Sequence, residues 1–169
     1  MIKHLTVDHV TISTDRPFEQ VVGDFEENVG TLEDIGWDSI PAASTDQADF
    51  EARVKERLGP SGFTRFLTID HGKWVTMQGR PTKFIMYTIG NPLIAITMID
   101  HDIEAGLDVP VRLAIYQHAD GSTRFVYNTP SSLMSSLENA ALHEAALKLD
   151  GKMLALAQLV TGSTPGSLA

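Results

Sequence analysis

The chain has 169 residues, of which 43% are hydrophobic and 21% charged, a composition that fits one globular domain and excludes a disordered protein. Its 22 acidic and 13 basic residues give a formal net charge of −9, and no basic stripe is present to neutralise phosphates, which disfavours a nucleic acid or an anionic membrane surface as a partner. The absence of cysteine excludes disulfides, thiolate metal sites and thiol nucleophiles.

The first two predicted elements are a strand and a helix. Residues 2–14 are rich in β-branched side chains and predict a strand. Asp15 can cap the helix that follows, and Pro17 is tolerated in its first turn. Apolar residues then recur on one helical face until Gly30 ends the pattern, namely Phe18, Val21, Val22, Phe25 and Val29.

Residues 31–58 carry weaker patterns than the rest of the chain. Residues 31–45 predict a loop, with Trp37 packed back onto the core. Asp46 marks the start of a second helix, whose apolar stripe is narrow. We expect this helix to be peripheral, and the Gly-Pro-Ser-Gly sequence at residues 59–62 to end it.

The centre of the predicted sheet follows. Residues 63–70 predict a strand, and a loop at residues 79–81 separates it from the next one. Residues 83–89 are apolar on both faces of a strand, which is typical of a central position. The pair Asn91–Pro92 then predicts the start of a helix over residues 93–99, which is apolar nearly all round and is therefore expected to be buried.

The last third of the chain predicts a hairpin and a long helix. After a polar connection, residues 110–117 predict a third core strand. Asp120–Gly121 is a hairpin turn, so residues 123–127 are expected to return antiparallel. Thr129–Pro130 opens a long helical region, in which apolar residues keep helical spacing, namely Leu142, Ala145, Ala146, Leu149, Met153, Leu156 and Val160.

The predicted order of elements is β-α-α-β-β-α-β-β-α, which favours a single α+β domain with a mostly antiparallel sheet and helices packed on it. We expect this domain to span residues 1–161 and residues 162–169 to form a flexible tail. Lys3 and Asp8 interrupt what would be the apolar stretch of a signal peptide, and no apolar run approaches the ~18–20 residues that span a bilayer. We therefore expect a cytoplasmic protein.

Four motifs carry a family resemblance. They are the Ile-Gly-Asn-Pro sequence at residues 89–92 with its apolar helix, the stretch over residues 107–116 with its Pro-x-Arg motif, the Asp-Gly turn, and the Pro-Ser-Ser-Leu sequence at residues 130–133. Together they resemble the domain of unknown function 302 family. The resemblance implies a compact α+β domain that is commonly a dimer, in a family with no settled biochemical role.

The sequence departs from the family pattern in three places. Residues 31–58 are longer than the resemblance predicts, so we interpret this segment as an insertion. The family often has cysteine immediately before Asn-Pro and again after the following proline, where this chain has Gly90 and Val111. A redox or thiolate-metal role attached to those cysteines therefore does not apply to this chain.

The motifs of several common enzyme classes are absent from the sequence. It has no Walker-type phosphate loop, no dinucleotide fingerprint, no His-Glu-x-x-His motif and no Gly-x-Ser-x-Gly elbow. Their joint absence disfavours a common NTPase, dehydrogenase, zinc protease or esterase.

Five residues are candidates for binding a small anionic or planar ligand. Arg112 and Tyr116 share one face of a strand, and an arginine among apolar residues needs a partner, either a ligand carboxylate or phosphate or an internal acidic residue. Lys83 and Tyr87 share a face of the neighbouring strand, and His71 ends the strand before it. If these faces meet, they form a cationic and aromatic site; alternatively, Lys83 lies at a sheet edge and Tyr87 packs in the core.

A second candidate site is the sequence Asp100-His101-Asp102, with Glu104 nearby. An imidazole flanked by carboxylates could bind a divalent metal, or His101 could act as a general base. The alternative is a solvated loop, which we favour because adjacent residues in a loop rarely point at one ion.

The sequence leaves three classes of function open. Our leading hypothesis is a small-ligand-binding or interaction domain that works as a homodimer without catalysing a reaction. The rival is an enzyme in which His71 or His101 supplies acid/base or metal chemistry. The third is a purely structural dimer whose partner is another protein. The sequence identifies neither the ligand nor any cofactor.

Overall fold

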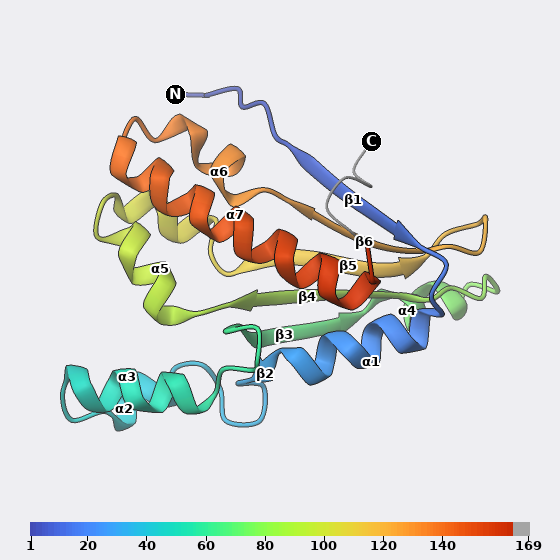
Figure 1. Ribbon diagram of the computed structural model, residues 1–169, viewed down its shortest axis with the longest axis horizontal. Helices are drawn as coiled ribbons and strands as arrows, with labels where there is room; N and C mark the ends of the chain where they lie inside the picture. The colour runs from blue at the N-terminus through green and yellow to red at the C-terminus, as the bar shows by residue number, and fades with distance from the viewer. Residues whose placement is uncertain (164–169) are drawn as a thin grey trace.

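The computed structural model describes residues 1–163, and these form one mixed sheet with helices on one of its faces (Figure 1). The six strands lie in the order β1-β6-β5-β4-β3-β2. Neighbouring strands are antiparallel except for the short parallel pair β2 and β3. The bounds are β1 His9–Thr14, β2 Gly30–Thr31, β3 Thr64–Asp70, β4 Phe84–Gly90, β5 Val111–Gln117 and β6 Thr123–Asn128. The predicted fold class, a mostly antiparallel α+β domain, is confirmed.

The helices differ in their relation to the sheet. The two longest, α1 and α7, contact each other and cover the same face of the sheet, whereas α2 and α3 project beyond the end of the sheet (Figure 1). The bounds are α1 Phe18–Asn28, α2 Ser39–Ala43, α3 Gln47–Glu56, α4 His71–Thr76, α5 Pro92–Ile99, α6 Pro130–Leu133 and α7 Ala140–Thr161, with short 3₁₀ turns at Ile103–Leu107 and Met134–Ser136. None of these helices combines the length and the apolar character that a membrane span requires.

Side-chain caps explain where several helices begin. Asp46 accepts a hydrogen bond from the backbone N–H of Asp49 at the start of α3, as the sequence predicts. Asn91 caps α5 in the same way, and Pro92 occupies its first position. The predicted cap at Asp15 is wrong, because α1 begins one residue after Pro17 and has no side-chain cap.

Three predicted boundaries also differ from the structure. Residues 2–8 are not a strand, because pairing between β1 and β6 starts at His9 opposite Asn128, where β6 ends. The segment after β3 forms the short helix α4, which Asp70 caps by accepting a hydrogen bond from the N–H of Lys73. The predicted loop at residues 31–45 contains β2 at its start and α2 near its end.

The hydrophobic side chains form two separate clusters. The main core lies between the sheet and helices α1 and α7, with fully buried members such as Phe25, Ile89 and Met153. The second cluster consists of Leu32, Ile40 and Val54, against which Phe50, Leu58, Phe66 and Leu93 pack. Residues 31–58, hereafter the 31–58 lobe, therefore contribute a small apolar cluster of their own, which β3 and α5 help to cover.

The end of α7 lies close to the limit of the described residues. Gly162 ends the helix with a left-handed φ of 70°, and its N–H donates to the carbonyl of Gln158. Of the predicted tail at residues 162–169, positions 164–169 lie outside the described residues. The extent of the domain, residues 1–161, stays a prediction. The interpretation of residues 31–58 as an insertion also stays a prediction.

Candidate functional site

The sheet separates the residues that the sequence placed in one ligand site. Tyr87 lies opposite Leu113, while Arg112 lies opposite Thr88. Cross-strand neighbours point to the same side of a sheet, so Tyr87 and Arg112 point to opposite faces. The hypothesis that the Tyr87 face meets the Arg112 face is therefore wrong. The strand at residues 83–89 is apolar on both faces, so its pattern does not show which face lies on the side of Arg112.

Tyr87 and Lys83 both belong to the side of the sheet that α1 covers. Tyr87 is fully buried, and its hydroxyl donates to Oε1 of Glu26 at 3.2 Å. Burial, and then the negative charge of Glu26, raise the pKa of Tyr87 above its ordinary value. The Lys83 ammonium pairs with Glu19 and lies 5.8 Å from the ring centre of Phe18. Both residues thus have partners within the fold.

His71 and Tyr116 approach each other on the uncovered face of the sheet, on either side of one phenylalanine. The His71 ring lies 5.5 Å from that of Phe84, and Phe84 stacks on Tyr116 at 5.6 Å. Trp74 packs edge-on against His71 at 4.9 Å. Within residues 1–163 no carboxylate hydrogen-bonds to the His71 imidazole, so this row of rings lacks the acid/base pair that the enzyme hypothesis needs.

Arg112 points into solvent from the uncovered face. It is exposed, and among the described residues it forms no ion pair, so its charge is not buried and needs no partner. Arg112 lines a surface hollow of about 480 Å³ together with Asp108 and Thr88. Burial raises the pKa of the Asp108 carboxyl, and the guanidinium of Arg112 only partly offsets this effect.

The candidate metal ligands do not converge. His101 is exposed, and its backbone carbonyl accepts a hydrogen bond from the side chain of Asn139. The Asp102 carboxylate accepts from the N–H of Glu104 at the start of a 3₁₀ turn. In the part of the chain that the structure describes, no three His, Cys, Asp or Glu side chains are placed to hold a metal ion. The metal hypothesis at Asp100, His101 and Asp102 therefore has no geometric support in this region.

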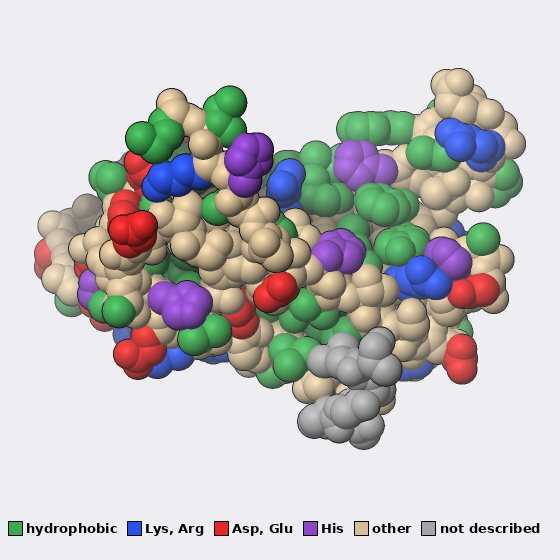
Figure 2. Space-filling view, turned by 90° about the horizontal axis from the view of Figure 1, so that it is seen from above, with side chains coloured by type: hydrophobic (Ala, Val, Ile, Leu, Met, Phe, Trp, Pro, Cys, Tyr) green, Lys and Arg blue, Asp and Glu red, His purple; other side chains and the backbone are tan. Residues whose placement is uncertain are grey.

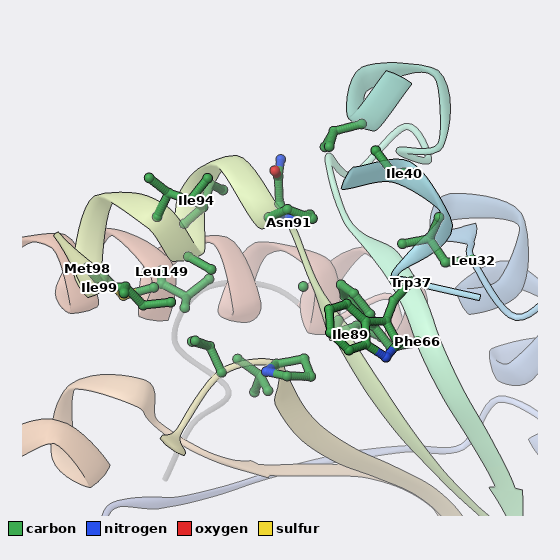
Figure 3. A pocket seen from close by; sticks show the side chains of 18 of the residues that line it. Leu32, Trp37, Ile40, Phe66, Ile89, Asn91, Ile94, Met98, Ile99 and Leu149 are labelled. Atoms are coloured by element: carbon green, nitrogen blue, oxygen red, sulfur yellow. The ribbon is translucent and has the colours of Figure 1, made fainter. Parts of the chain in front are cut away.

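A cavity of about 340 Å³ opens between α5, the adjoining ends of β4 and β5, and the 31–58 lobe (Figure 3). Side chains from α5 lie on one side of it and side chains from the lobe on the other. Its lining contains no charged residue and consists of Leu32, Trp37, Ile40, Pro41, Phe50, Val54, Phe66, Ile89, Gly90, Asn91, Pro92, Ile94, Ala95, Ile96, Met98, Ile99, Val109, Pro110, Val111 and Leu149.

Helix α5 and Trp37 are less buried than the sequence predicts. Of the eight residues of α5 only Met98 is fully buried, and Ile96 is 41% exposed. The expectation that an apolar helix is buried is wrong here, because part of its surface faces an open cavity instead of protein atoms. Trp37 is 65% exposed and lines the same cavity from the lobe, so it does not pack back onto the core.

The cavity is the feature that the sequence analysis missed. A sequence signal for it existed in residues 93–99, which carry more apolar surface than one neighbouring helix or sheet can cover. The signal was ambiguous, because the same pattern is also typical of a helix at the centre of a core. Only the position of the 31–58 lobe decides between the two.

The remaining surface shows no basic stripe on the side displayed in Figure 2, where acidic and basic side chains are interspersed. On the same side, hydrophobic side chains gather in the hollow between two projecting parts of the surface (Figure 2). This distribution agrees with the net charge of −9 and gives no support to a nucleic-acid interface.

Residues 40–160, more than half of the chain, match the family described as Domain of unknown function DUF302. The chain belongs to the DUF302 family. A crystal structure of an uncharacterized conserved protein DUF302 from Bacillus stearothermophilus has a TM-score of 0.64 and 16% identity, over 90% of this chain and 97% of that one. At this identity the similarity shows the fold alone. No curated protein matches the chain.

The DUF302 resemblance bears on the cavity at two residues. Gly90 and Val111, the positions where it predicts cysteine, both line the cavity wall. Gly90 and Val111 bring a hydrogen atom and an isopropyl group to the wall. The wall therefore carries no sulfur nucleophile and no thiolate ligand at either position.

Proposed function

We propose that this DUF302 protein binds a small apolar molecule in the cavity between α5 and the 31–58 lobe and does not catalyse a reaction on it. The observation that carries the proposal is a cavity of about 340 Å³ with a wall made almost entirely of carbon. Ligand sites start at about 300 Å³, and an apolar cavity of about 150 Å³ already holds benzene. A bicyclic ring or a short hydrocarbon chain fits this range.

The exposed apolar surface of α5 supports the proposal energetically. Apolar surface removed from water stabilises a complex by about 25 cal/mol per Å², and Ile96 and Trp37 are exposed at 41% and 65%. For a ligand of about a dozen non-hydrogen atoms, ~0.5 kcal/mol per atom corresponds to a Kd of tens of micromolar. We expect affinities of that order.

Fluorescence titration with N-phenyl-1-naphthylamine, a neutral apolar probe, tests this function. The variant Ala95→Trp fills the cavity from α5, whereas Ala155→Trp makes the same change at an exposed position of α7 that does not line it. We expect saturable binding to the wild type and to Ala155→Trp, and at least a tenfold weaker affinity for Ala95→Trp. No saturable binding to the wild type, or equal affinities for all three proteins, would overturn the proposal.

We further infer that the protein works as a homodimer through the uncovered face of its sheet. Half-buried apolar side chains point outward there from three central strands, namely Ile69, Phe84, Met86 and Tyr116. Two sheets can pack face to face through such side chains, and a twofold interface needs one self-complementary patch. The outward positions of β1 are polar, so the patch is confined to the middle of the sheet.

Native mass spectrometry tests the dimer. We expect a mass of twice the 18.5 kDa chain for the wild type, a monomer for Met86→Lys at the centre of the patch, and a dimer for Thr11→Lys on β1. A monomeric wild type, or a Met86→Lys variant that stays dimeric, contradicts this interface.

The hollow beside Arg112 is the second candidate ligand site. It is favoured by its volume of about 480 Å³ and by a guanidinium without an ion pair in the described chain. The adjacent carboxylate of Asp108 opposes an anionic ligand, and for this reason we rank the hollow below the cavity. Amide chemical shifts of ¹⁵N-labelled protein titrated with inorganic phosphate decide the matter. Saturable shifts around residues 108–112 that disappear in Arg112→Gln would establish the second site, and their absence would eliminate it.

A further inference from the structure

We infer that the cavity selects neutral ligands and rejects anionic ones, so that its ligands are hydrocarbons, neutral alcohols or esters and not carboxylates or phosphates. This inference rests on the proposed function and specifies the ligand class of the same site. It follows from the hydrogen bonds within the protein that the polar groups at the cavity wall already form.

The N-terminus of α5 lies in the wall, and such a terminus usually offers free N–H groups to an anion. Here the first residue is Pro92, which has no N–H. The N–H of Leu93 donates to the Asn91 side chain at 2.9 Å. Those of Ile94 and Ala95 both donate to the Asn91 carbonyl, at 3.0 and 2.9 Å. The first four residues of the helix therefore offer no free donor to a ligand.

Asn91, the only amide side chain in the lining, is used in the same way. Its Oδ1 accepts from Leu93, and its Nδ2 donates to the carbonyl of Gly62 at 3.0 Å. Three of the lining residues are prolines, namely Pro41, Pro92 and Pro110, and prolines bring no donor. The indole N–H of Trp37 remains as a neutral donor at the lobe side.

Among the described residues, the cavity wall holds no cation to replace these donors. None of the lining residues is lysine, arginine or histidine, and the protein carries a net charge of −9. A carboxylate that enters loses part of its hydration and gains no charged partner, only the single neutral donor of Trp37, and this loss is costly. A neutral ligand of the same shape loses much less.

A matched pair of competitors tests the inference. 2-Naphthalenemethanol and 2-naphthoate share one ring system and differ in charge, and each is titrated against N-phenyl-1-naphthylamine bound to the wild type. We expect the alcohol to displace the probe at a concentration at least tenfold lower than the carboxylate. Equal competition by the two compounds would overturn the selectivity and leave the proposed function intact, whereas a probe that does not bind at all would overturn the proposed function itself.

A charge introduced at the rim provides the converse test. Ile96→Lys places an ammonium at an exposed lining position, and Leu159→Lys makes a similar change on α7, where the leucine is 57% exposed and does not line the cavity. We expect Ile96→Lys to improve competition by 2-naphthoate at least fivefold with little change for the alcohol, and Leu159→Lys to behave as the wild type. A gain for 2-naphthoate of the same size in both variants would show a general charge effect and contradict a role for the wall.

Discussion

Asp108 is a carboxyl group whose surroundings oppose its charge. It is partly buried at the entrance to β5, burial raises its pKa, and Arg112 compensates only in part. Because its pKa is higher in the folded than in the unfolded protein, the folded state binds more protons. The contribution of this group to stability is therefore present below the unfolded pKa and is lost as the pH rises through the folded pKa.

This reasoning predicts the effect of Asp108→Asn. The amide cannot ionise, so we expect the variant to be more stable than the wild type at pH 7 and to lose that advantage toward pH 4, near the pKa of about 3.9 of an unfolded aspartate. Urea unfolding at several pH values measures the difference. Glu104→Gln, at an exposed neighbouring position, serves as the control and is expected to show little difference; an advantage of Asp108→Asn that grows on acidification would contradict the assignment.

Single residues also show what the sequence could and could not establish. The face shared by Arg112 and Tyr116 followed from the strand period alone and agrees with the register. The partners of Tyr87 did not, because they depend on how β4 pairs with β5 and on where α1 lies. The interpretation of Arg112 as a charge in need of a partner was wrong because Arg112 is exposed. The pattern of a strand does not reveal which face of the sheet stays uncovered.

At the scale of elements, strong local signals gave reliable predictions. The Asn-Pro start of α5, the capped start of α3 and the Asp-Gly hairpin between β5 and β6 are all present as predicted. The short helices α2 and α4 were missed, because five or six residues are too few to establish a helical period. The two long helices and the central strand pair required only their own apolar patterns.

The cap of α5 links stability to the proposed cavity. Asn91→Ala removes both the hydrogen bond to Leu93 and the one to Gly62, so we expect a loss of about 1–2 kcal/mol in the free energy of unfolding. Because α5 forms one wall of the cavity, we also expect the affinity for N-phenyl-1-naphthylamine to fall severalfold. Urea unfolding and probe titration measure the two effects separately.

Asn139→Ala is the matched control for that variant. Asn139 caps α7 by accepting a hydrogen bond from Leu142, and α7 contributes only Leu149 to the cavity lining. We expect a similar loss of stability with an unchanged probe affinity. Equal losses of affinity in both variants would mean that probe binding follows overall stability and not the position of α5.

At the scale of the whole molecule, the 31–58 lobe is attached at two neighbouring points. The N–H groups of Gly30 and Gly59 both donate to the carbonyl of Phe63, at 3.0 and 2.9 Å. Insertions are tolerated where the two ends of the added segment lie close together. Neighbouring ends are what an inserted segment requires, and the insertion at residues 31–58 stays a prediction.

Replacing residues 33–57 by a short Gly-Ser linker tests this interpretation. The main core between the sheet and helices α1 and α7 does not include the lobe, so we expect the variant to fold, with a far-UV circular dichroism spectrum that retains the sheet and α7. We expect at least a tenfold loss of probe affinity, since one side of the cavity is removed. An unfolded variant would contradict the insertion, and retained affinity would contradict the location of the site.

The second hydrophobic cluster has a consequence for how this molecule moves. Leu32, Ile40 and Val54 form a core much smaller than the one under the sheet, so releasing them costs less free energy than unfolding the whole chain. The amides of α3 are then expected to exchange with deuterium through partial openings, while those of β4 and β5 exchange only through global unfolding. One chain would thus show two tiers of protection, with the boundary between them running through the space where a ligand would sit.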